Sequence, residues 1–123
     1  MKHALFVALA LCLLHGCGRR LDPDADAVKA DAALQTALEA WKSGKAPEDL
    51  EKEQPAILMN EDDWRLGKRL LEFKMEKGSL SGRQVRCRVR IKLQDKDRTV
   101  DREAVYIIDT TPRIVIVRDS FAS

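Results

Sequence analysis

Two kinds of hydrophobic spacing run along the chain, first that of a helix and then that of strands. Between residues 27 and 41, apolar side chains recur every three or four positions, which predicts a helix with one apolar face. Asp22, Pro23 and Asp24 supply an N-cap, a first-turn proline and a first-turn acid, and Gly44 suits the C-terminal cap. We therefore expect a helix of about 21 residues, near 30 Å long at about 1.5 Å per residue. Its apolar face consists of Ala27, Ala30, Leu34, Ala37, Leu38 and Trp41.

The spacing changes to that of strands after a short second helix, which begins at Pro47 and ends before Pro55. A short apolar run at 57–59 and a capped helical turn at 60–64 come next. A half-buried strand is then predicted by apolar residues that alternate with charged ones, namely Leu71, Phe73 and Met75.

The clearest strand is VRCRVRIKL at 85–93, in which apolar and basic residues alternate strictly. Across the polar turn at 95–98 lies a second strand, 99–109, and closing that turn pairs Gln94 with Thr99. This register also sets opposite charges and apolar residues against each other, which favours it by about 0.2–1 kcal/mol per pair. The pairs are Lys92 with Asp101, Arg90 with Glu103, Val89 with Ala104, Cys87 with Tyr106, and Val85 with Ile108.

A last strand is predicted at 113–118. The predicted order is therefore a long helix, a short helix and then four or five mostly antiparallel strands. The runs ALEAWKSGKAPEDL, DDWRLGKRL and RCRVRIKL…VYIIDTTP resemble small secreted proteins of planctomycete-like bacteria. The arrangement also resembles the cystatin-like architecture of the nuclear transport factor two-like superfamily. That resemblance implies an α+β domain over 22–123, in which a curved sheet wraps the long N-terminal helix. These motifs bear on fold and leave function open.

The N-terminus has the layout of an export signal. Lys2 precedes an uncharged run of about eleven residues at 4–14, whereas a membrane-spanning helix needs roughly 20. A run of this length suits the core of a signal peptide, which we place at 1–16.

Leu14-His15-Gly16-Cys17 resembles the lipobox of bacterial lipoproteins. The resemblance implies cleavage between Gly16 and Cys17, a diacylglycerol on the Cys17 thiol, and fatty acyl chains such as palmitate as the membrane anchor. The alternative is an ordinary signal peptide with a cysteine nearby by chance. Residues 17–21 then form the lipidated cysteine and a tether of less than roughly 20 Å. Arg19 and Arg20 either meet anionic headgroups or are solvated linker residues.

Composition excludes several classes of function. The net charge of +2 falls to about +1 when Lys2 is removed, and acidic and basic residues are evenly mixed, which argues against nucleic acid as a partner. His3 and His15 both lie in the predicted signal peptide, so the mature chain has no histidine for nucleophilic catalysis or a metal site. With Cys12 removed and Cys17 lipidated, the thiol of Cys87 is the one that remains free, so no internal disulfide can form. We expect no metal and no cofactor.

Some of the remaining candidates are better explained by packing. Cys87 faces inward among valines and is interpreted as a small core residue, with a reactive thiol as the alternative. Trp41 and Trp64 are expected to pack the helix on the sheet, and a ligand pocket formed with the inward-facing Tyr106 is the alternative. The basic row, as we call the outward-facing positions of the strand at 85–93, consists of Arg86, Arg88, Arg90 and Lys92. It is either a solvated face with ion pairs or a surface that binds anions or a partner.

No catalytic acid–base pair emerges from the sequence. Enzymes of the superfamily that this arrangement resembles use a carboxylate, often with a histidine or tyrosine, inside the cone-shaped space between the helix and the sheet. The pattern places Glu72 and Glu103 outside and Asp62 and Asp63 at a helix cap, and Asp109 is the other carboxylate considered.

We therefore expect a non-enzymatic, lipid-anchored binding or assembly module of the cell envelope, facing the periplasm or the exterior. It would contact membrane lipid through its anchor and another envelope protein or itself through the outer sheet face. The alternative is a small-ligand-binding domain or a weak lyase or isomerase with a cone-shaped pocket.

Overall fold

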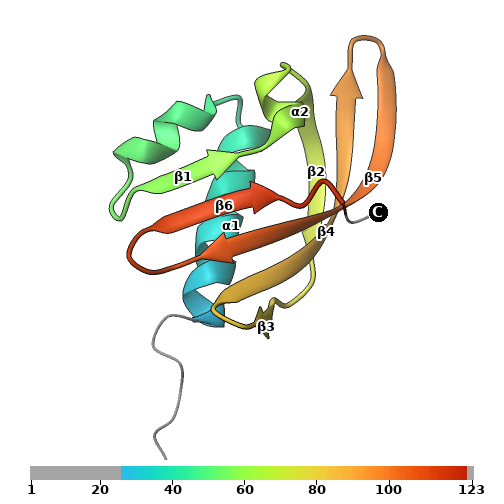
Figure 1. Cartoon of the computed structure of the whole chain (residues 1–123). Coiled ribbons are helices and arrows are strands. Elements are labelled where there is room, and N and C mark those ends of the chain that lie inside the picture. The colour runs from blue at the N-terminus through green and yellow to red at the C-terminus, as the bar shows by residue number, and fades with distance from the viewer. Residues whose placement is uncertain (1–25, 122–123) are drawn as a thin grey trace, which may run out of the picture.

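Between residues 26 and 121, the part of the chain that the computed structural model describes, six strands form one mixed sheet that curls around a helix (Figure 1). The α+β class is confirmed, with more strands than the four or five expected. Cys17, Gly16 and the predicted signal peptide lie outside the described residues. In chain order the elements are α1 (Ala27–Lys42), η2 (Pro47–Lys52), β1 (Ile57–Asn60), α2 (Asp62–Arg65), β2 (Arg69–Met75), β3 (Ser79–Ser81), β4 (Gln84–Asp95), β5 (Arg98–Asp109) and β6 (Ile114–Arg118).

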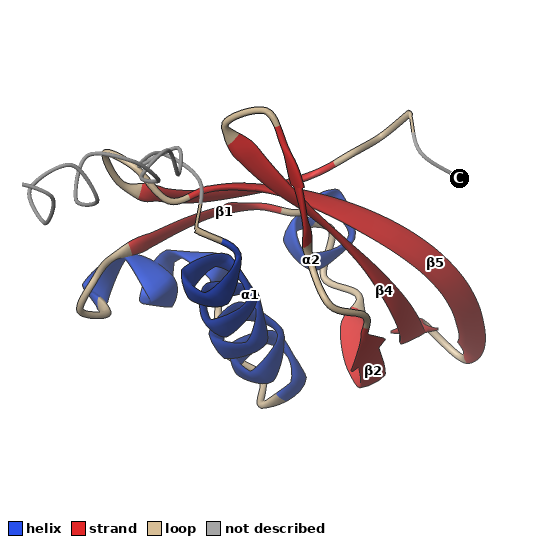
Figure 2. Cartoon of the chain, turned by 90° about the horizontal axis from the view of Figure 1, so that it is seen from below, coloured by secondary structure: helices blue, strands red, loops and turns tan. Residues whose placement is uncertain are grey.

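The sheet has the order β1-β6-β5-β4-β2, and the short β3 also pairs with β4. The sequence predicts mostly antiparallel strands, and every pair but one is antiparallel; β1 runs parallel to β6. Figure 2 shows the sheet arching over α1, which lies on its concave side.

The helix α1 has 16 residues, so the expected helix of about 21 residues is too long. Asp26 has an extended backbone, and its side chain accepts a hydrogen bond from the backbone N–H of Lys29 at 3.0 Å. Asp26 is therefore the N-cap, in place of Asp22, and the helix spans about 24 Å. Its predicted apolar face is confirmed, since the residues buried on it include Ala30, Leu34, Ala37, Leu38 and Trp41.

The predicted short helix and the capped turn are both present, as η2 and α2. The strand β2 differs in one respect. A β-bulge between Leu70 and Glu72 shifts the pairing with β4, so Leu70 is the buried leucine and the predicted inward position of Leu71 is wrong. Phe73 and Met75 pack partly buried against the core, as the alternation predicts.

The predicted register of β4 and β5 is confirmed at every pair. Val85, Cys87, Val89, Ile91 and Leu93 all point into the core. On the outer face Arg88 forms a diagonal ion pair, since it contacts Glu103 at 3.0 Å although Arg90 lies opposite that residue. Long charged side chains reach diagonal neighbours as easily as direct ones.

A close contact joins the first turns of α1 to the β2–β3 connection. The backbone N–H of Gly78 donates to the carboxylate of Asp31, at 3.2 and 3.3 Å from its two oxygens. A Cβ at Gly78 would lie 2.5 Å from Asp31 Oδ1 and 2.8 Å from Val85 Cγ1. A side chain at Gly78 would therefore have to displace the Asp31 carboxylate and the Val85 methyl group.

Candidate functional site

A carboxylate and a phenol are buried together beneath the sheet. Glu61 follows β1 and is the N-cap of α2, where its Oε1 accepts the backbone N–H of Asp63 at 2.9 Å. Tyr106, on β5, donates its hydroxyl hydrogen to Oε2 of Glu61. Neither residue has any exposed surface. The two residues join the turn before α2 to the middle of the sheet.

Arg118, at the end of β6, connects this pair to a second carboxylate. Its Nη1 donates to Oε1 and Oε2 of Glu61 at 2.9 and 3.0 Å, and to Oδ2 of Asp63 at 3.0 Å. Tyr106 and Arg118 are cross-strand neighbours, so the antiparallel pairing of β5 and β6 places both beside Glu61.

Asp63 binds two further cations. Lys68 Nζ lies 2.8 Å from Oδ1, and Arg102 Nη1 lies 2.9 Å from Oδ2. Every buried side-chain nitrogen and oxygen in the described residues has a hydrogen-bond partner. The acid cluster, as we call this group, consists of Glu61, Asp63, Lys68, Arg102, Tyr106 and Arg118.

The acid cluster shifts the pKa of its members in opposite directions. Burial raises the pKa of Asp63, but hydrogen bonds from Lys68 and Arg118 and the charge of Arg102 outweigh this and hold the pKa below its ordinary value. Burial first, and then the charge of Glu61, raise the pKa of Tyr106 well above its ordinary value. At neutral pH Asp63 is therefore ionised and Tyr106 is a neutral hydrogen-bond donor.

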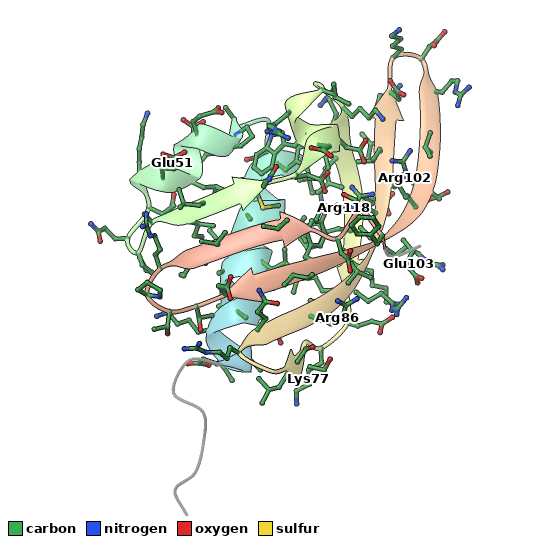
Figure 3. All side chains as sticks on the ribbon, viewed as in Figure 1. Glu51, Lys77, Arg86, Arg102, Glu103 and Arg118 are labelled. Atoms are coloured by element: carbon green, nitrogen blue, oxygen red, sulfur yellow. The ribbon has the colours of Figure 1, made fainter. Side chains whose placement is uncertain are left out.

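A hollow of about 270 Å³ lies beside the acid cluster. Arg102 and Arg118 both line it and both bind the same oxygen of Asp63, and Figure 3 shows them on the neighbouring strands β5 and β6. Glu61 and Tyr106 do not line the hollow, which is formed by Asp62, Asp63, Arg102, Arg118, Asp119 and Ser120. A molecule in it would meet guanidinium and carboxylate groups, without access to the buried pair.

The two tryptophans pack against each other at the C-terminal end of α1. Their rings are stacked, with centroids 5.4 Å apart and planes inclined by 10°. The indole N–H of Trp41 donates to the carbonyl of Lys68, and that of Trp64 to the carbonyl of Lys45, each at 2.9 Å. Both rings border a surface hollow of about 260 Å³, but Tyr106 does not line it. The structure therefore does not gather the three candidate pocket residues around one site.

The basic row of β4 is largely paired. Arg86 lies 3.2 Å from Asp119, and Lys92 lies 3.6 Å from Glu72. With Arg88 bound to Glu103, this leaves Arg90 as the member without an ion-pair partner among residues 26–121. Cross-strand pairing sets Arg90 between Lys74 and Glu103 on the outer face.

Beside the basic row, the outer face of the sheet carries aliphatic side chains. Arg86 pairs with Ile107 across β4 and β5, Ile107 pairs with Val117 on β6, and Val115 pairs with Leu58 on β1. Polar residues are the usual covering of the solvent face of such a sheet. We call this surface the outer patch; it consists of Leu58, Ile107, Val115 and Val117, of which Val117 is exposed and the others are partly buried.

Cys87 is a buried core residue, as predicted. Its Sγ lies 3.1 Å from the carbonyl oxygen of Glu76. Burial, followed by the charges of Asp31 and Glu76, raises the pKa of the Cys87 thiol to about 11. At neutral pH the thiol is therefore protonated, which makes it a poor nucleophile.

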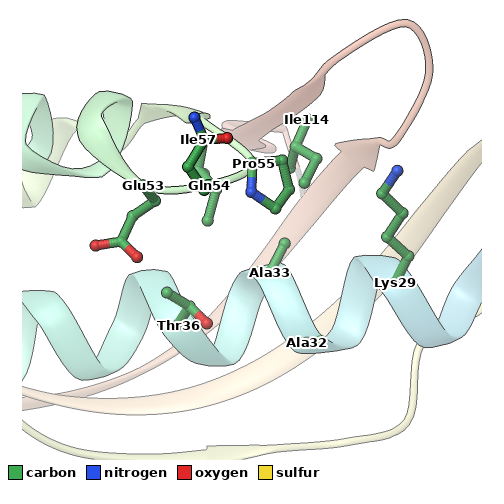
Figure 4. Close-up of a pocket in the computed structure, with 9 residues that line it drawn as sticks. All are labelled: Lys29, Ala32, Ala33, Thr36, Glu53, Gln54, Pro55, Ile57 and Ile114. Atoms are coloured by element: carbon green, nitrogen blue, oxygen red, sulfur yellow. The ribbon is translucent and has the colours of Figure 1, made fainter.

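A third, mainly apolar hollow of about 230 Å³ lies between α1 and the chain leading into β1 (Figure 4). Ala33, Pro55, Ile57 and Ile114 form much of its wall, and Lys29 stands at its side. Sequence spacing did not reveal it, because it depends on how the segment before β1 crosses the helix.

Sequence reasoning misses four residues of the acid cluster, namely Glu61, Lys68, Arg102 and Arg118. The sequence places Glu61 in a capped turn and offers its neighbours Asp62 and Asp63 as candidate carboxylates. Only Asp63 of those two joins the acid cluster; Asp62 is exposed and pairs with Arg65 at 2.6 Å. The available signal was the inward position of Tyr106, because a buried phenol needs a hydrogen-bond partner.

Comparison with known proteins adds no assignment. No family model matches the chain, and no curated protein or solved structure is significantly similar to it. Between residues 26 and 121, no helix is long and apolar enough to cross a membrane. The same residues include no group of three or more histidine, cysteine, aspartate or glutamate side chains placed to hold a metal ion.

Proposed function

We propose that the protein is a lipid-anchored, extracytoplasmic binding module of cystatin-like fold that performs no catalysis. The lipobox resemblance at Cys17 supports the anchor, and a curled sheet around one helix agrees with the cystatin-like resemblance. In this proposal the domain lies at the cell envelope and faces the periplasm or the exterior.

The proposal that the protein performs no catalysis rests on the burial of the Glu61–Tyr106 pair. These residue types serve as acid and base in enzymes, but a catalytic group must come within hydrogen-bond reach of its substrate. Both side chains are fully buried, and the Glu61 oxygens are occupied by Tyr106, Arg118 and the turn of α2. The arrangement therefore favours a structural role for the pair.

Binding is assigned to the outer patch and the adjacent basic row. Contiguous aliphatic side chains beside arginines suit a protein segment that carries both aliphatic and acidic side chains. Arg90 is available to pair with such a carboxylate, since its neighbour Glu103 is engaged by Arg88. The partner in this proposal is an envelope protein with that chemistry, and self-association is the competing outcome.

The test begins with the intact mass of the protein extracted by detergent from its own membranes. A chain that starts at Cys17 and carries two or three acyl chains supports the anchor. A photo-crosslinking residue is then placed at Val117, and a control is placed at the exposed Glu48 of η2. We expect a discrete hetero-adduct from position 117 only, whose crosslinked peptide contains aspartate or glutamate.

The decisive control is charge reversal. Arg88→Glu with Arg90→Glu should abolish the adduct, whereas Lys42→Glu with Lys52→Glu, an equal change of charge on α1 and η2, should leave it intact. An adduct that survives the arginine changes would show that the basic row is only solvated surface. An adduct of twice the chain mass would replace the hetero-partner by a second copy.

A second candidate, a small-ligand-binding domain, is favoured by the apolar hollow of Figure 4. Its volume of about 230 Å³ lies below the range of about 300–1,000 Å³ for drug-sized ligands, so it suits a short apolar tail. The neighbouring Lys29 would hold an acidic headgroup on such a tail. Calorimetric titration with a short-chain fatty acid tests it; binding that Ala33→Trp abolishes would favour this candidate.

A further inference from the structure

Two aliphatic side chains project into solvent at one end of the domain. Val28, in the first turn of α1, is 81% exposed, and Leu80, in β3, is 59% exposed. Such exposure costs free energy in water, in proportion to the apolar area exposed.

These side chains share one end of the molecule, although 52 positions separate them (80 − 28). Asp31 lies one helical turn after Val28 and accepts a hydrogen bond from Gly78, two residues before Leu80. Figure 1 shows the first turn of α1 beside β3 at the same end. It is also the end at which the chain enters the described domain, at Asp26.

Two lysines lie near the pair in the sequence, Lys29 next to Val28 and Lys77 three residues before Leu80. Lys29 and Lys77 are both exposed. Two carboxylates at this end are engaged with backbone N–H groups, Asp26 with Lys29 and Asp31 with Gly78. Glu76 is the exposed acid beside Lys77. Aliphatic side chains flanked by lysines are typical of surfaces that lie in the headgroup region of a bilayer.

We propose that this end rests on the membrane, with Val28 and Leu80 inserted at the boundary of headgroups and acyl chains and with Lys29 and Lys77 at lipid phosphates. The inference rests on the proposed anchor at Cys17. Because α1 begins at Ala27, residues 18–25 separate Cys17 from the cap at Asp26, a span of at most roughly 30 Å. This span keeps the entry end within reach of the bilayer.

The far end of the domain provides a matched control. Leu66, which closes α2, is 75% exposed, as open to water as the proposed contact residues. It lies two residues after Trp64, which stacks on Trp41 in the last turn of α1. Val28 and Trp41 are 13 positions apart on the helix, about 20 Å along its axis. A bilayer at the entry end would therefore leave Leu66 in water.

The experiment uses the acylated protein purified from its own membranes. Val28→Cys, Leu80→Cys and Leu66→Cys variants each receive a nitroxide label, since Cys87 is buried and does not compete. Each labelled variant is measured in detergent-free vesicles of phosphatidylglycerol and phosphatidylcholine, and the label at 66 is the reference. We expect the labels at 28 and 80 to collide more often with oxygen, and less often with a soluble nickel chelate, than the label at 66. Labels at 28 and 80 that stay as open to the chelate as the label at 66 overturn the inference.

A second measurement needs no substitution. On the same vesicles, a water-soluble acetylating reagent should modify Lys29 and Lys77 more slowly than Lys42, and detergent should remove the difference. Equal rates on vesicles overturn the inference. The intact mass separates the two proposals: an unacylated chain removes the anchor and this inference together, whereas an acylated chain with water-exposed labels removes the inference alone.

Discussion

The hydroxyl of Tyr106 donates a hydrogen bond to Oε2 of Glu61, and neither side chain reaches solvent. The contact joins two segments that are 45 positions apart, so it holds the turn before α2 against the sheet. Arg118 supplies the charge that balances Glu61 in the interior. Buried charges are tolerated when paired in this way, and removal of one partner is costly.

Stability should fall unequally when the two partners are changed. Tyr106→Phe removes one donor but leaves Glu61 bound to Arg118, so we expect a loss of about 1–3 kcal/mol in the free energy of unfolding. Glu61→Ala deprives the partly buried Arg118 of two hydrogen bonds, leaves the buried Tyr106 hydroxyl without its acceptor and removes the N-cap of α2. We therefore expect a larger loss, of about 3–5 kcal/mol. Urea unfolding of the two variants measures both values. A Glu61→Ala variant as stable as Tyr106→Phe would show that Arg118 is not held by Glu61.

Tyr106 also predicts an alkaline limit to stability. Burial and the charge of Glu61 raise its pKa in the folded protein, whereas in the unfolded chain it titrates near about 10. A group whose folded pKa is raised stabilises the fold below its unfolded pKa, and this contribution is lost as pH rises above it. The chain has one tyrosine, so phenolate absorbance reports Tyr106 alone. Folded protein that shows phenolate absorbance near pH 10 would contradict the prediction.

The lowered pKa of Asp63 predicts a loss of stability at acidic pH. Its pKa is lowered in the folded protein, so its contribution to stability is present above the unfolded value of about 3.9 and is lost as pH falls through the folded value. We expect the unfolding free energy to fall below about pH 4, and to fall less steeply in Asp63→Asn. As a control, Asp62→Asn, at an exposed carboxylate of the same helix, should keep the pH dependence of the unchanged protein.

The hairpin of β4 and β5 shows what sequence can specify. A slip by one residue would turn Val89 and Tyr106 to the solvent, so burial and the turn at 95–98 together allow one register. The bulge at Leu71 in β2 was missed for a related reason: Leu70 and Leu71 are equally apolar, and which of them faces the core depends on pairing with β4. Likewise, the proline and the acid that follow Asp22 predict that residue as the N-cap, whereas the structure has Asp26 in that role.

The acid cluster could not be read from the sequence because its members come from separate elements. Glu61, Arg102 and Arg118 meet only when β6 lies between β1 and β5. The parallel pairing of β1 with β6 creates that arrangement, and local spacing carries no signal for it. The same topology brings Leu58, Ile107 and Val117 onto one face as the outer patch.

Gly78 should tolerate no side chain. A Cβ would lie 2.5 Å from Asp31 Oδ1 and 2.8 Å from Val85 Cγ1, so Gly78→Ala must displace the Asp31 carboxylate, which accepts the Gly78 N–H, and the Val85 methyl group. We expect a loss of about 1–3 kcal/mol in the unfolding free energy, measured by urea unfolding. The neighbouring Ser79→Ala, at an exposed position, is the control and should change stability by less than about 0.5 kcal/mol. If Asp31→Ala restores part of the loss in Gly78→Ala, the close approach of the helix is its cause.

The Trp41–Trp64 stack should hold α2 to the end of α1. Trp64→Ala removes a buried ring and the hydrogen bond to the Lys45 carbonyl, so we expect a loss of about 3–5 kcal/mol in the unfolding free energy. Trp64→Phe keeps a ring against Trp41 but loses the indole donor, and it should cost less. Circular dichroism in the near ultraviolet gives an independent readout, because the signal of two stacked indoles disappears in either variant. A Trp64→Phe variant as unstable as Trp64→Ala would show that the hydrogen bond to Lys45, rather than the stacking, fixes α2 in place.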